Sequence, residues 1–417
     1  MHRIMAAVLA ASACASSLQA QTATVSTESV LSLDAALEAA GASSPAIDAA
    51  QSGVRVAAAQ RSVAGLRPNP SIDGMVENVA GTGDYRGLRS AETTVGVSLP
   101  IELGGKRSAR IAVADAQLGR AALDAAMAKV DLRLRVTLAY NEAVASDRRA
   151  DNAREQLGIA AEGLRAAKVR VAAGRASPIE EQRAEVARLN ADGAAERTER
   201  SADVARANLA LLIGRTTSVL DRVWFEQVTT MGPVQPVDAA GTLAAAAARA
   251  DLSTADAQVR LARSQRIPDL TIGVAARRPE RSNDVAGVFS LSVPLPLFNN
   301  GRAAVDLASA QRQQADARRR LALLDAEQAI ASARADVANA ATTARNATGP
   351  TLAAAQEAAR IARIGYREGK FGQLDLLDAE RTLAETKAAA IDALAAYHDA
   401  QARLERLVAP APTEDAR

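Results

Sequence analysis

The chain has 417 residues, of which 48% are hydrophobic, 24% charged and 2% aromatic, and its formal net charge is +2. So few aromatic side chains exclude several globular domains with thick cores, whereas abundant Ala, Arg, Glu and Leu are typical of long, closely packed helices. The near-zero net charge argues against a nucleic-acid partner, because phosphate binding needs a concentrated basic face. The densest basic cluster, at residues 318–320, has Asp316 and Asp325 close by and is interpreted as a solvated helix face.

Residues 1–20 have the pattern of a secretory signal peptide. His2 and Arg3 form a short basic start, residues 4–13 are apolar, and small residues lead to a cleavage site after Ala20. The apolar stretch is too short for a membrane-spanning helix, which needs about 20 residues. Cys14, the only cysteine, would leave with this segment. The alternative is that Cys14 is lipidated, because residues 11–14 loosely resemble a lipoprotein cleavage box.

The remaining sequence is one unit that occurs twice, at residues 21–214 and 238–409. Residues 174–185 align with residues 369–380 at an offset of 195, and residues 98–101 match residues 292–295. Residues 69–72 likewise have a counterpart at 267–270. Because the landmarks keep their order, we expect each copy to fold into the same series of elements.

Each copy is predicted to contain a helix, then a β-hairpin, then a long helical hairpin. Alternating apolar residues place the β-hairpins at about 70–101 and 269–296, with turns at 81–84 and 278–284. Pro100, Pro294 and Pro296 lie where strands are expected to end. The helical hairpins are expected to have their tips near 174–178 and 369–372. A continuous helix over 105–173 would extend roughly 100 Å.

The last predicted helix has a coiled-coil seam that repeats every seven residues. A version with smaller side chains occurs in the first copy. The seam positions are Leu376, Leu383, Ala390, Tyr397 and Leu404 in the second copy, and Ala184, Ala191, Thr198, Ala205 and Leu212 in the first.

Residues 215–237 break the helical pattern and are interpreted as a crossover between the two copies, with Trp224 as an anchor of its own packed patch. Residues 410–417 are predicted to form a flexible tail. Four strands cannot close a membrane barrel alone, so membrane insertion would require several copies of the chain. The alternative is that the β-hairpins lie against a soluble surface.

The block at 369–379, the Pro-Leu-Pro-Leu-Phe-Asn-Asn-Gly block at 294–301 and the duplication resemble the TolC family of outer-membrane efflux proteins. Residues 268–271, 292–298 and 396–400 are most similar to the CzcC-type ducts of cobalt, zinc and cadmium efflux systems. The resemblance implies a mainly α fold with a small β part. Long coiled-coil hairpins would form an α-barrel across the periplasm, and four strands per subunit would contribute to a trimeric transmembrane β-barrel.

The resemblance also implies a function and a set of partners. A homotrimer in the outer membrane of a Gram-negative bacterium, surrounded by outer-membrane lipid, would extend into the periplasm. It would dock with a periplasmic adaptor, or membrane fusion protein, and an RND-type inner-membrane pump, and would passively conduct heavy-metal cations. The alternatives are a multidrug or type I secretion duct of the same family, and a periplasmic coiled-coil adaptor or scaffold, which would need only one helical hairpin.

The resemblance implies that the two helical tips contact the adaptor. The alternative is that their glycines belong to ordinary turns, where glycine takes a positive φ without steric cost. The tip residues are Gly174, Arg175, Ala176 and Ser177 in the first copy, and Gly369, Lys370, Phe371 and Gly372 in the second.

A periplasmic gate is the second feature that the resemblance implies. Asp375 and Asp378 lie three residues apart on one helix face, so three copies would place six carboxylates around the entrance. The alternative is a solvated helix start, where acids suit the helix dipole. Tyr366 and Glu180 match gate positions of the family, whereas Phe371 stands where the family prototype has a gate-locking arginine.

The sequence contains no catalytic, cofactor-binding or metal-binding constellation of useful specificity. After signal cleavage His398 is the sole imidazole. It is expected to be an exposed, incidental helix residue, so metal specificity would reside in the pump. Only Tyr85 and Phe289 supply aromatic rings in or beside the strands, fewer than an outer-membrane barrel usually has.

Overall fold

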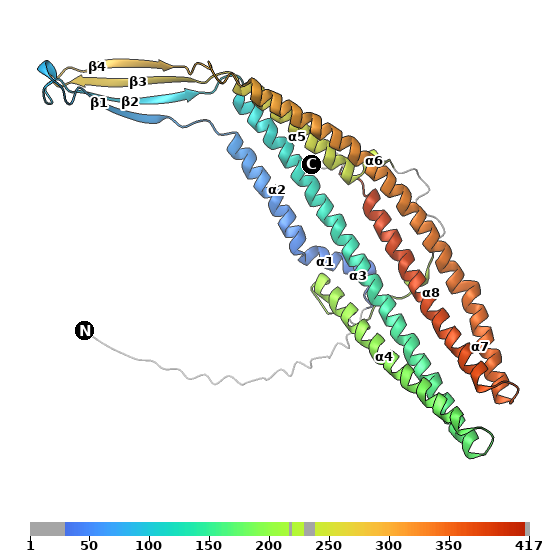
Figure 1. The fold of residues 1–417 in the computed structure, drawn as a ribbon. Coiled ribbons are helices and arrows are strands. Elements are labelled where there is room, and N and C mark those ends of the chain that lie inside the picture. Colours follow the sequence, from blue (N-terminus) through green and yellow to red (C-terminus); the bar gives the residue numbers. More distant parts are fainter. Residues whose placement is uncertain (1–29, 217–218, 229–237, 413–417) are drawn as a thin grey trace, which may run out of the picture.

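The computed structural model describes residues 30–216, 219–228 and 238–412. The expected signal peptide at 1–20 lies outside the described residues, as do parts of the crossover and of the C-terminal tail. The molecule is elongated, with a sheet at one end and long helices leading away from it (Figure 1). None of the helices in the described ranges is both long enough and apolar enough to cross a membrane.

The sheet contains four antiparallel strands in sequence order, β1 (Ser71–Glu77), β2 (Glu92–Ile101), β3 (Leu270–Pro279) and β4 (Ala286–Ser292). β1–β2 and β3–β4 are the two predicted hairpins. β2 pairs with β3 along its whole length, so the two copies of the unit join into one sheet. Among the described residues, β1 and β4 each pair on one side only. The predicted turn at 81–84 lies in a longer loop that contains a 3₁₀ turn, Gly83–Tyr85.

The helical part differs between the two copies. The first copy has α1 (Leu33–Ser43), α2 (Pro45–Ala64), α3 (Lys106–Ala172) and α4 (Pro178–Ile213), and the second has α5 (Leu243–Gln265), α6 (Arg302–Asn346), α7 (Leu352–Arg367) and α8 (Gln373–Val408). The 67 residues of α3 form one uninterrupted helix, about 100 Å long at 1.5 Å per residue. Its counterpart divides at a π-helical turn, Ala347–Thr351, where Gly349 leaves the helical region and Pro350 lacks an N–H donor.

In both copies, the long helix that follows the β-hairpin begins after a glycine with a left-handed backbone conformation. Gly105 precedes α3 and Gly301 precedes α6, each with a φ of 72°, a left-handed conformation that glycine adopts without steric cost. The exit from the sheet in the first copy is also held by a residue of the second copy, Asp269, which precedes β3. Asp269 Oδ1 accepts hydrogen bonds from Lys106 Nζ at 2.7 Å and from the Leu103 N–H at 3.1 Å. The residues that begin β3 therefore hold the start of α3 in place.

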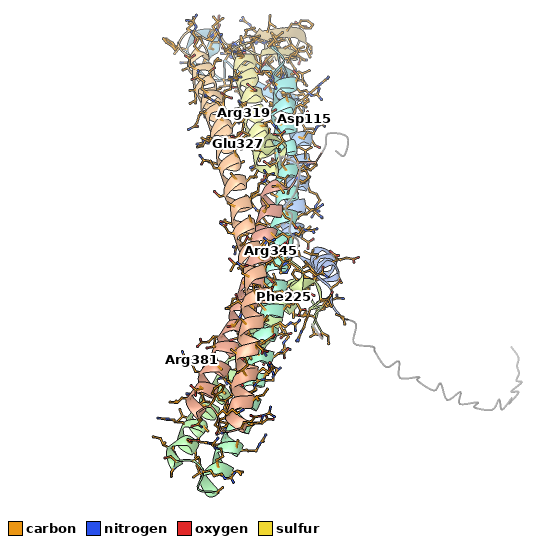
Figure 2. The ribbon with its side chains drawn as sticks, turned by 90° about the vertical axis from the view of Figure 1, so that its right-hand side faces the viewer. Asp115, Phe225, Arg319, Glu327, Arg345 and Arg381 are labelled. Carbon is orange, nitrogen blue, oxygen red and sulfur yellow. The ribbon has the colours of Figure 1, made fainter. Side chains whose placement is uncertain are left out.

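The main core lies near the middle of the helical part, where α1, α3, α4, α6 and α8 meet the crossover (Figure 2 labels Phe225 there). The predicted anchor, Trp224, packs its ring 5.8 Å from that of Tyr140 and 4.1 Å from that of His398. His398 is buried at 6% exposure, and its Nε2 lies 2.9 Å from the Phe225 carbonyl oxygen. The expectation of an exposed His398 was wrong because α8 turns this position toward the crossover.

The coiled-coil seam of α8 has the predicted periodicity. Leu383, Ala390, Tyr397 and Leu404 are buried, and Leu376, near the tip, is half-buried. In α4 the seam is shallower, with Ala184 and Ala205 buried and the intervening positions half-buried. Small side chains let the helices approach closely, which explains how a chain with few aromatics holds long helices together.

The end of the chain returns to the start of the second copy. Pro410 forms an antiparallel bridge with Thr242, and the Ala411 N–H donates to the Gly241 carbonyl oxygen at 3.0 Å. The first residues of the segment expected to be flexible are therefore attached to the helical part.

Candidate functional site at the helical tips

The turns that join α3 to α4 and α7 to α8 lie at the end of the molecule opposite the sheet (Figure 1). Gly174 has a φ of 67° and Gly369 a φ of 73°. Each is followed by a residue whose N–H reaches back five positions, Arg175 to the Arg170 carbonyl at 2.9 Å and Lys370 to the Gly365 carbonyl at 2.8 Å. This is the glycine-dependent end of a helix known as the Schellman motif, so both tips share one backbone geometry.

Tyr366 and Glu180, which the resemblance assigns to one gate, belong to opposite tips, and Arg170 of the first tip contacts Tyr366 of the second. The Arg170 guanidinium carbon lies 4.6 Å from the centre of the Tyr366 ring, within the range of a cation–π contact. Tyr366 is buried at 7% exposure. Burial raises the pKa of Tyr366 and the charge of Glu180 raises it further, while Arg170 opposes the shift. The phenol therefore stays neutral at physiological pH.

A second contact between the copies lies beside the first. Gln373, the first residue of α8, is buried and donates from Nε2 to the Glu180 carbonyl oxygen at 2.9 Å. Three side-chain atoms in this contact, Arg170 Nε, Glu180 Oε2 and Gln373 Oε1, are buried without a hydrogen-bond partner among the described residues. Each such group costs roughly 1–3 kcal/mol. These unpaired groups therefore oppose the contact between the tips.

Arg170 and Gln373 were missed by the sequence reasoning. A signal was available for Arg170, because at the repeat offset of 195 its place is taken by Gly365 in the second copy. Gly365 has its own use: a Cβ there would lie 2.1 Å from Cδ2 of the Phe371 ring. Phe371 thus packs over its own helix end, while in the first copy the arginine extends to the other tip.

Asp375 and Asp378 are both exposed near the start of α8. Asp375 Oδ2 accepts a hydrogen bond from the Gly372 N–H at 2.9 Å, so it caps the helix, as its alternative interpretation requires. Asp378 forms no such cap among the described residues. The pKa of Arg381 is raised mainly by its hydrogen bond to Glu385, and the charge of Asp378 adds a smaller contribution. The two aspartates therefore differ in local function, although they share one side of the helix.

The sheet has an apolar face and a polar face, and the apolar one is exposed. Val95, Val97 and Leu99 of β2 are 55%, 47% and 41% exposed, while the alternating polar positions are more shielded. Side chains are crowded on the polar face: a Cβ on Gly96 would lie 2.5 Å from that of Ala275. Such crowding is typical of the inner face of a curved sheet. This arrangement is the reverse of that in a water-soluble sheet.

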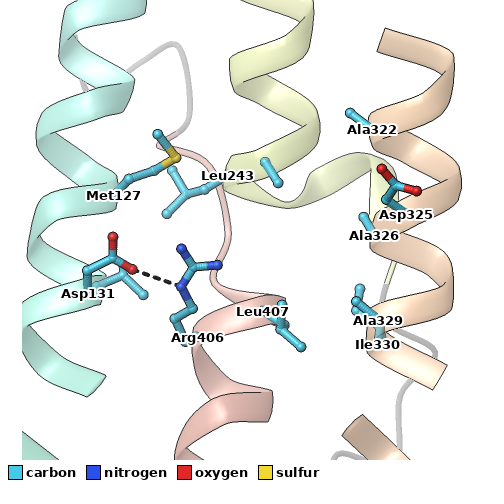
Figure 3. A pocket seen from close by; sticks show the side chains of 12 residues that line it. Met127, Asp131, Leu243, Ala322, Asp325, Ala326, Ala329, Ile330, Arg406 and Leu407 are labelled. Carbon is cyan, nitrogen blue, oxygen red and sulfur yellow. Dashed lines mark hydrogen bonds and ion pairs between the residues drawn. The ribbon is translucent and has the colours of Figure 1, made fainter. Parts of the chain in front are cut away.

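A part-open cavity of about 340 Å³ lies between α3, α5, α6 and α8 (Figure 3). On one wall Arg406 Nε bonds to Asp131 Oδ1 at 2.8 Å, and Asp325 lies across from it among alanine side chains. None of the predicted site residues lines this cavity. Over the described ranges no group of three or more His, Cys, Asp or Glu side chains could hold a metal ion.

An apolar exposed sheet with two open edges, continued by long helices, one of them about 100 Å in length, is the fold expected of one subunit of a channel. A sequence model of the outer membrane efflux protein family matches residues 36–215 and 242–409. The chain belongs to this family, which confirms the resemblance carried by the blocks at 294–301 and 369–379.

Two relatives and two solved structures show how far the similarity extends. The chain is 29% identical over 403 residues to the cobalt-zinc-cadmium resistance protein CzcC of Cupriavidus metallidurans, covering 91% of this chain and 90% of that protein. It is 34% identical over 299 residues, 71% of each chain, to the nickel and cobalt resistance protein CnrC of the same organism.

The solved structures show the fold alone, because their sequence identities are low. The crystal structure of CusC matches with a TM-score of 0.77 and 18% identity, covering 91% of this chain and 92% of that one. The outer membrane protein VceC from Vibrio cholerae matches with a TM-score of 0.75 and 19% identity, covering 91% and 96%.

Proposed function

We propose that three copies of this chain form an outer-membrane duct that passively conducts heavy-metal cations delivered by an inner-membrane RND-type pump through a periplasmic adaptor. The observation that carries the proposal is the reversed sheet, with its apolar face exposed and its outer strands β1 and β4 open to further pairing. Apolar side chains are stable against lipid, whereas unpaired strand edges are not, so the sheet must close with other copies. Three copies would supply twelve strands.

The metal substrate is supported by the relatives, which are named for resistance to cobalt, zinc, cadmium and nickel. The residues of the described chain add no metal-binding cluster to this argument. A passive tunnel needs none, because selection of the cation would take place in the pump.

The tips are the proposed gate and the proposed adaptor contact. In the gate, Asp375 and Asp378 would narrow the entrance as a ring of carboxylates, with Tyr366 and Glu180 bracing it. Arg170 and Gln373 join this set, because they make the contacts between the two tips. Since buried polar atoms remain unpaired there, separating the tips would release them to water and partly offset the lost contacts. Such a contact suits a gate that opens when an adaptor binds the turns at 174–177 and 369–372.

Deletion of the gene, followed by growth on metal salts, tests the proposed substrate. Loss of tolerance to cobalt, zinc, cadmium or nickel, restored by the full-length gene, is the expected result. Sensitivity to organic drugs alone would favour the multidrug duct of the same family, and loss of protein secretion would favour the type I secretion duct. Heat-modifiable trimers in outer-membrane fractions are expected, and recovery only from the soluble periplasm would favour an adaptor or scaffold.

A further inference from the structure

Arg277 lies near the end of β3 and pairs with Thr94 near the start of β2, on the polar face of the sheet. The loop that joins β1 to β2 lies at the end of the sheet away from the helices (Figure 1). Its guanidinium contacts two carboxylates on different strands, Glu77 on β1 at 3.1 Å and Glu92 on β2 at 3.1 Å. Its Nε also donates to Thr94 Oγ1 at 3.1 Å. Glu77 and Glu92 face each other across the β1–β2 pairing. One arginine therefore bridges two acids that would otherwise repel.

The polar face as a whole is acidic. Strand alternation places three carboxylates there, those of Asp73, Glu77 and Glu92, against the single guanidinium of Arg277, a net charge of −2 per chain. Asp73 is held separately, accepting a hydrogen bond from Ser98 Oγ at 2.5 Å. Arg278, next in sequence, belongs to the apolar face, where its Nε donates to Asn283 Oδ1 at 2.7 Å. Arg277 is thus the only positive charge on the polar face of the four strands.

We propose that Arg277 and the two glutamates it bridges determine the charge selectivity of the pore at its outer end. This inference rests on the proposed function, in which three copies close into a barrel with their polar faces lining the channel. Rings of acidic side chains favour cations in a pore. Arg277 moderates that preference by neutralising part of the ring, so that a cation is attracted to the mouth without being held there.

A purely structural role would give different results. If Arg277 only relieved the repulsion between Glu77 and Glu92, its loss would weaken the β1–β2 pairing and the assembled trimer. The ratio of cation to anion permeability would then stay constant in whichever trimers form. Measuring both the permeability ratio and the stability of the trimer therefore distinguishes a role in charge selectivity from a purely structural role.

The experiment measures reversal potentials of the purified full-length protein in planar bilayers across a KCl gradient. Arg277→Gln is expected to raise the ratio of K⁺ to Cl⁻ permeability, by about twofold or more. Glu77→Gln and Glu92→Gln are expected to lower it, and Arg277→Lys to keep it close to wild type. Arg278→Gln is the matched control, because it removes the same charge one residue away on the opposite face and should leave the ratio unchanged.

The outcomes distinguish this inference from the proposed function. Unchanged reversal potentials in Arg277→Gln and in both glutamate variants would overturn the inference about charge selectivity. The proposed function as a duct would be unaffected. The same would follow if Arg278→Gln shifted the ratio as much as Arg277→Gln. If Arg277→Gln fails to assemble, the two glutamate variants still test the inference, because each is expected to have a lower ratio of K⁺ to Cl⁻ permeability than the wild type. Absence of any conductance from the wild-type protein would instead count against the duct itself.

Discussion

The guanidinium of Arg170, on the first helical hairpin, stacks over the buried ring of Tyr366 on the second, 4.6 Å from its centre. Such a contact between a partly desolvated cation and an aromatic ring contributes about 0.5–2 kcal/mol. In the proposed gate, where the resemblance puts Phe371 in place of a locking arginine, Arg170 would supply the positive charge from the other tip. The lock in this chain would then be a contact between hairpins within one subunit.

Replacing Arg170 with Ala should therefore make the closed entrance open more often. The expected result is a higher open probability in planar bilayers, with Arg170→Lys intermediate because it keeps the charge. Tyr366→Leu should match Arg170→Ala, and the double variant should add little, since both changes remove one contact. Arg165→Ala is the control, because Arg165 is 73% exposed and its ion pair with Glu162 is long, at 3.8 Å. Independent, additive effects of the two variants would contradict the coupling.

The paired aspartates should give different results when each is removed. Asp378→Ala is expected to raise single-channel conductance without changing thermal stability. Asp375→Ala should raise conductance and also destabilise the start of α8 by about 0.5–1 kcal/mol, because its carboxylate caps the Gly372 N–H. Asp375→Asn, whose amide oxygen can still accept from the Gly372 N–H, should restore much of the stability but not the wild-type conductance. Unchanged conductance in both alanine variants would remove these residues as the constriction.

Elements that follow from local periodicity and repetition are predictable from this sequence. The strand pairs, the long helix after Gly105 and the turns at Gly174 and Gly369 each have a signal within a short window. Pairing of β2 with β3 is different, because it joins residues about 180 positions apart, as in the Thr94–Arg277 pair. Local patterns carry no register for such a contact. The π-helical turn at Gly349 was also unforeseen, although Gly-Pro in a helical stretch is a warning.

The candidate site was predictable only in part, for a similar reason. Tyr366 and Glu180 were found through resemblance to a family, not through any rule that would place them side by side. The Arg170 and Gln373 contacts depend on how the two hairpins lie against each other, which is set by the packing of α3 against α8 further along. His398 shows the same limit, since a lone histidine in a helix gives no indication of which neighbours cover it.

The buried His398 should make stability fall as the solution becomes acidic. Burial lowers the pKa of His398, although its contact with the Phe225 carbonyl opposes the shift. Below the ordinary imidazole pKa of about 6.5, the unfolded chain takes up a proton that the folded chain does not, so folding loses free energy as pH drops. The slope approaches about 1.4 kcal/mol per pH unit until the folded pKa is reached.

Thermal unfolding at pH 7.5 and 5.5, followed by the fluorescence of Trp224, would measure this loss. Trp224 is the only tryptophan and its ring contacts His398. His398→Phe should keep the aromatic packing and show a smaller drop in melting temperature over the same interval. Comparing the two proteins at each pH cancels the contribution of Asp399, whose pKa is raised by burial. An equal drop in both proteins would show that His398 does not titrate in this range.

Gly365 offers a test of whether the second tip meets the adaptor through Phe371. A Cβ at Gly365 would lie 2.1 Å from the Phe371 ring, so Gly365→Ala must displace the ring from the end of α7. We expect this change to reduce capture of the adaptor by a photo-crosslinking residue placed at Lys370, and Phe371→Ala to reduce it similarly. Gly158→Ala is the matched control, because a Cβ there meets nothing within 4 Å. It should stabilise α3 by roughly 0.5–1 kcal/mol and leave crosslinking unchanged. If Gly365→Ala crosslinks as well as the wild type, the position of the Phe371 ring does not matter for docking.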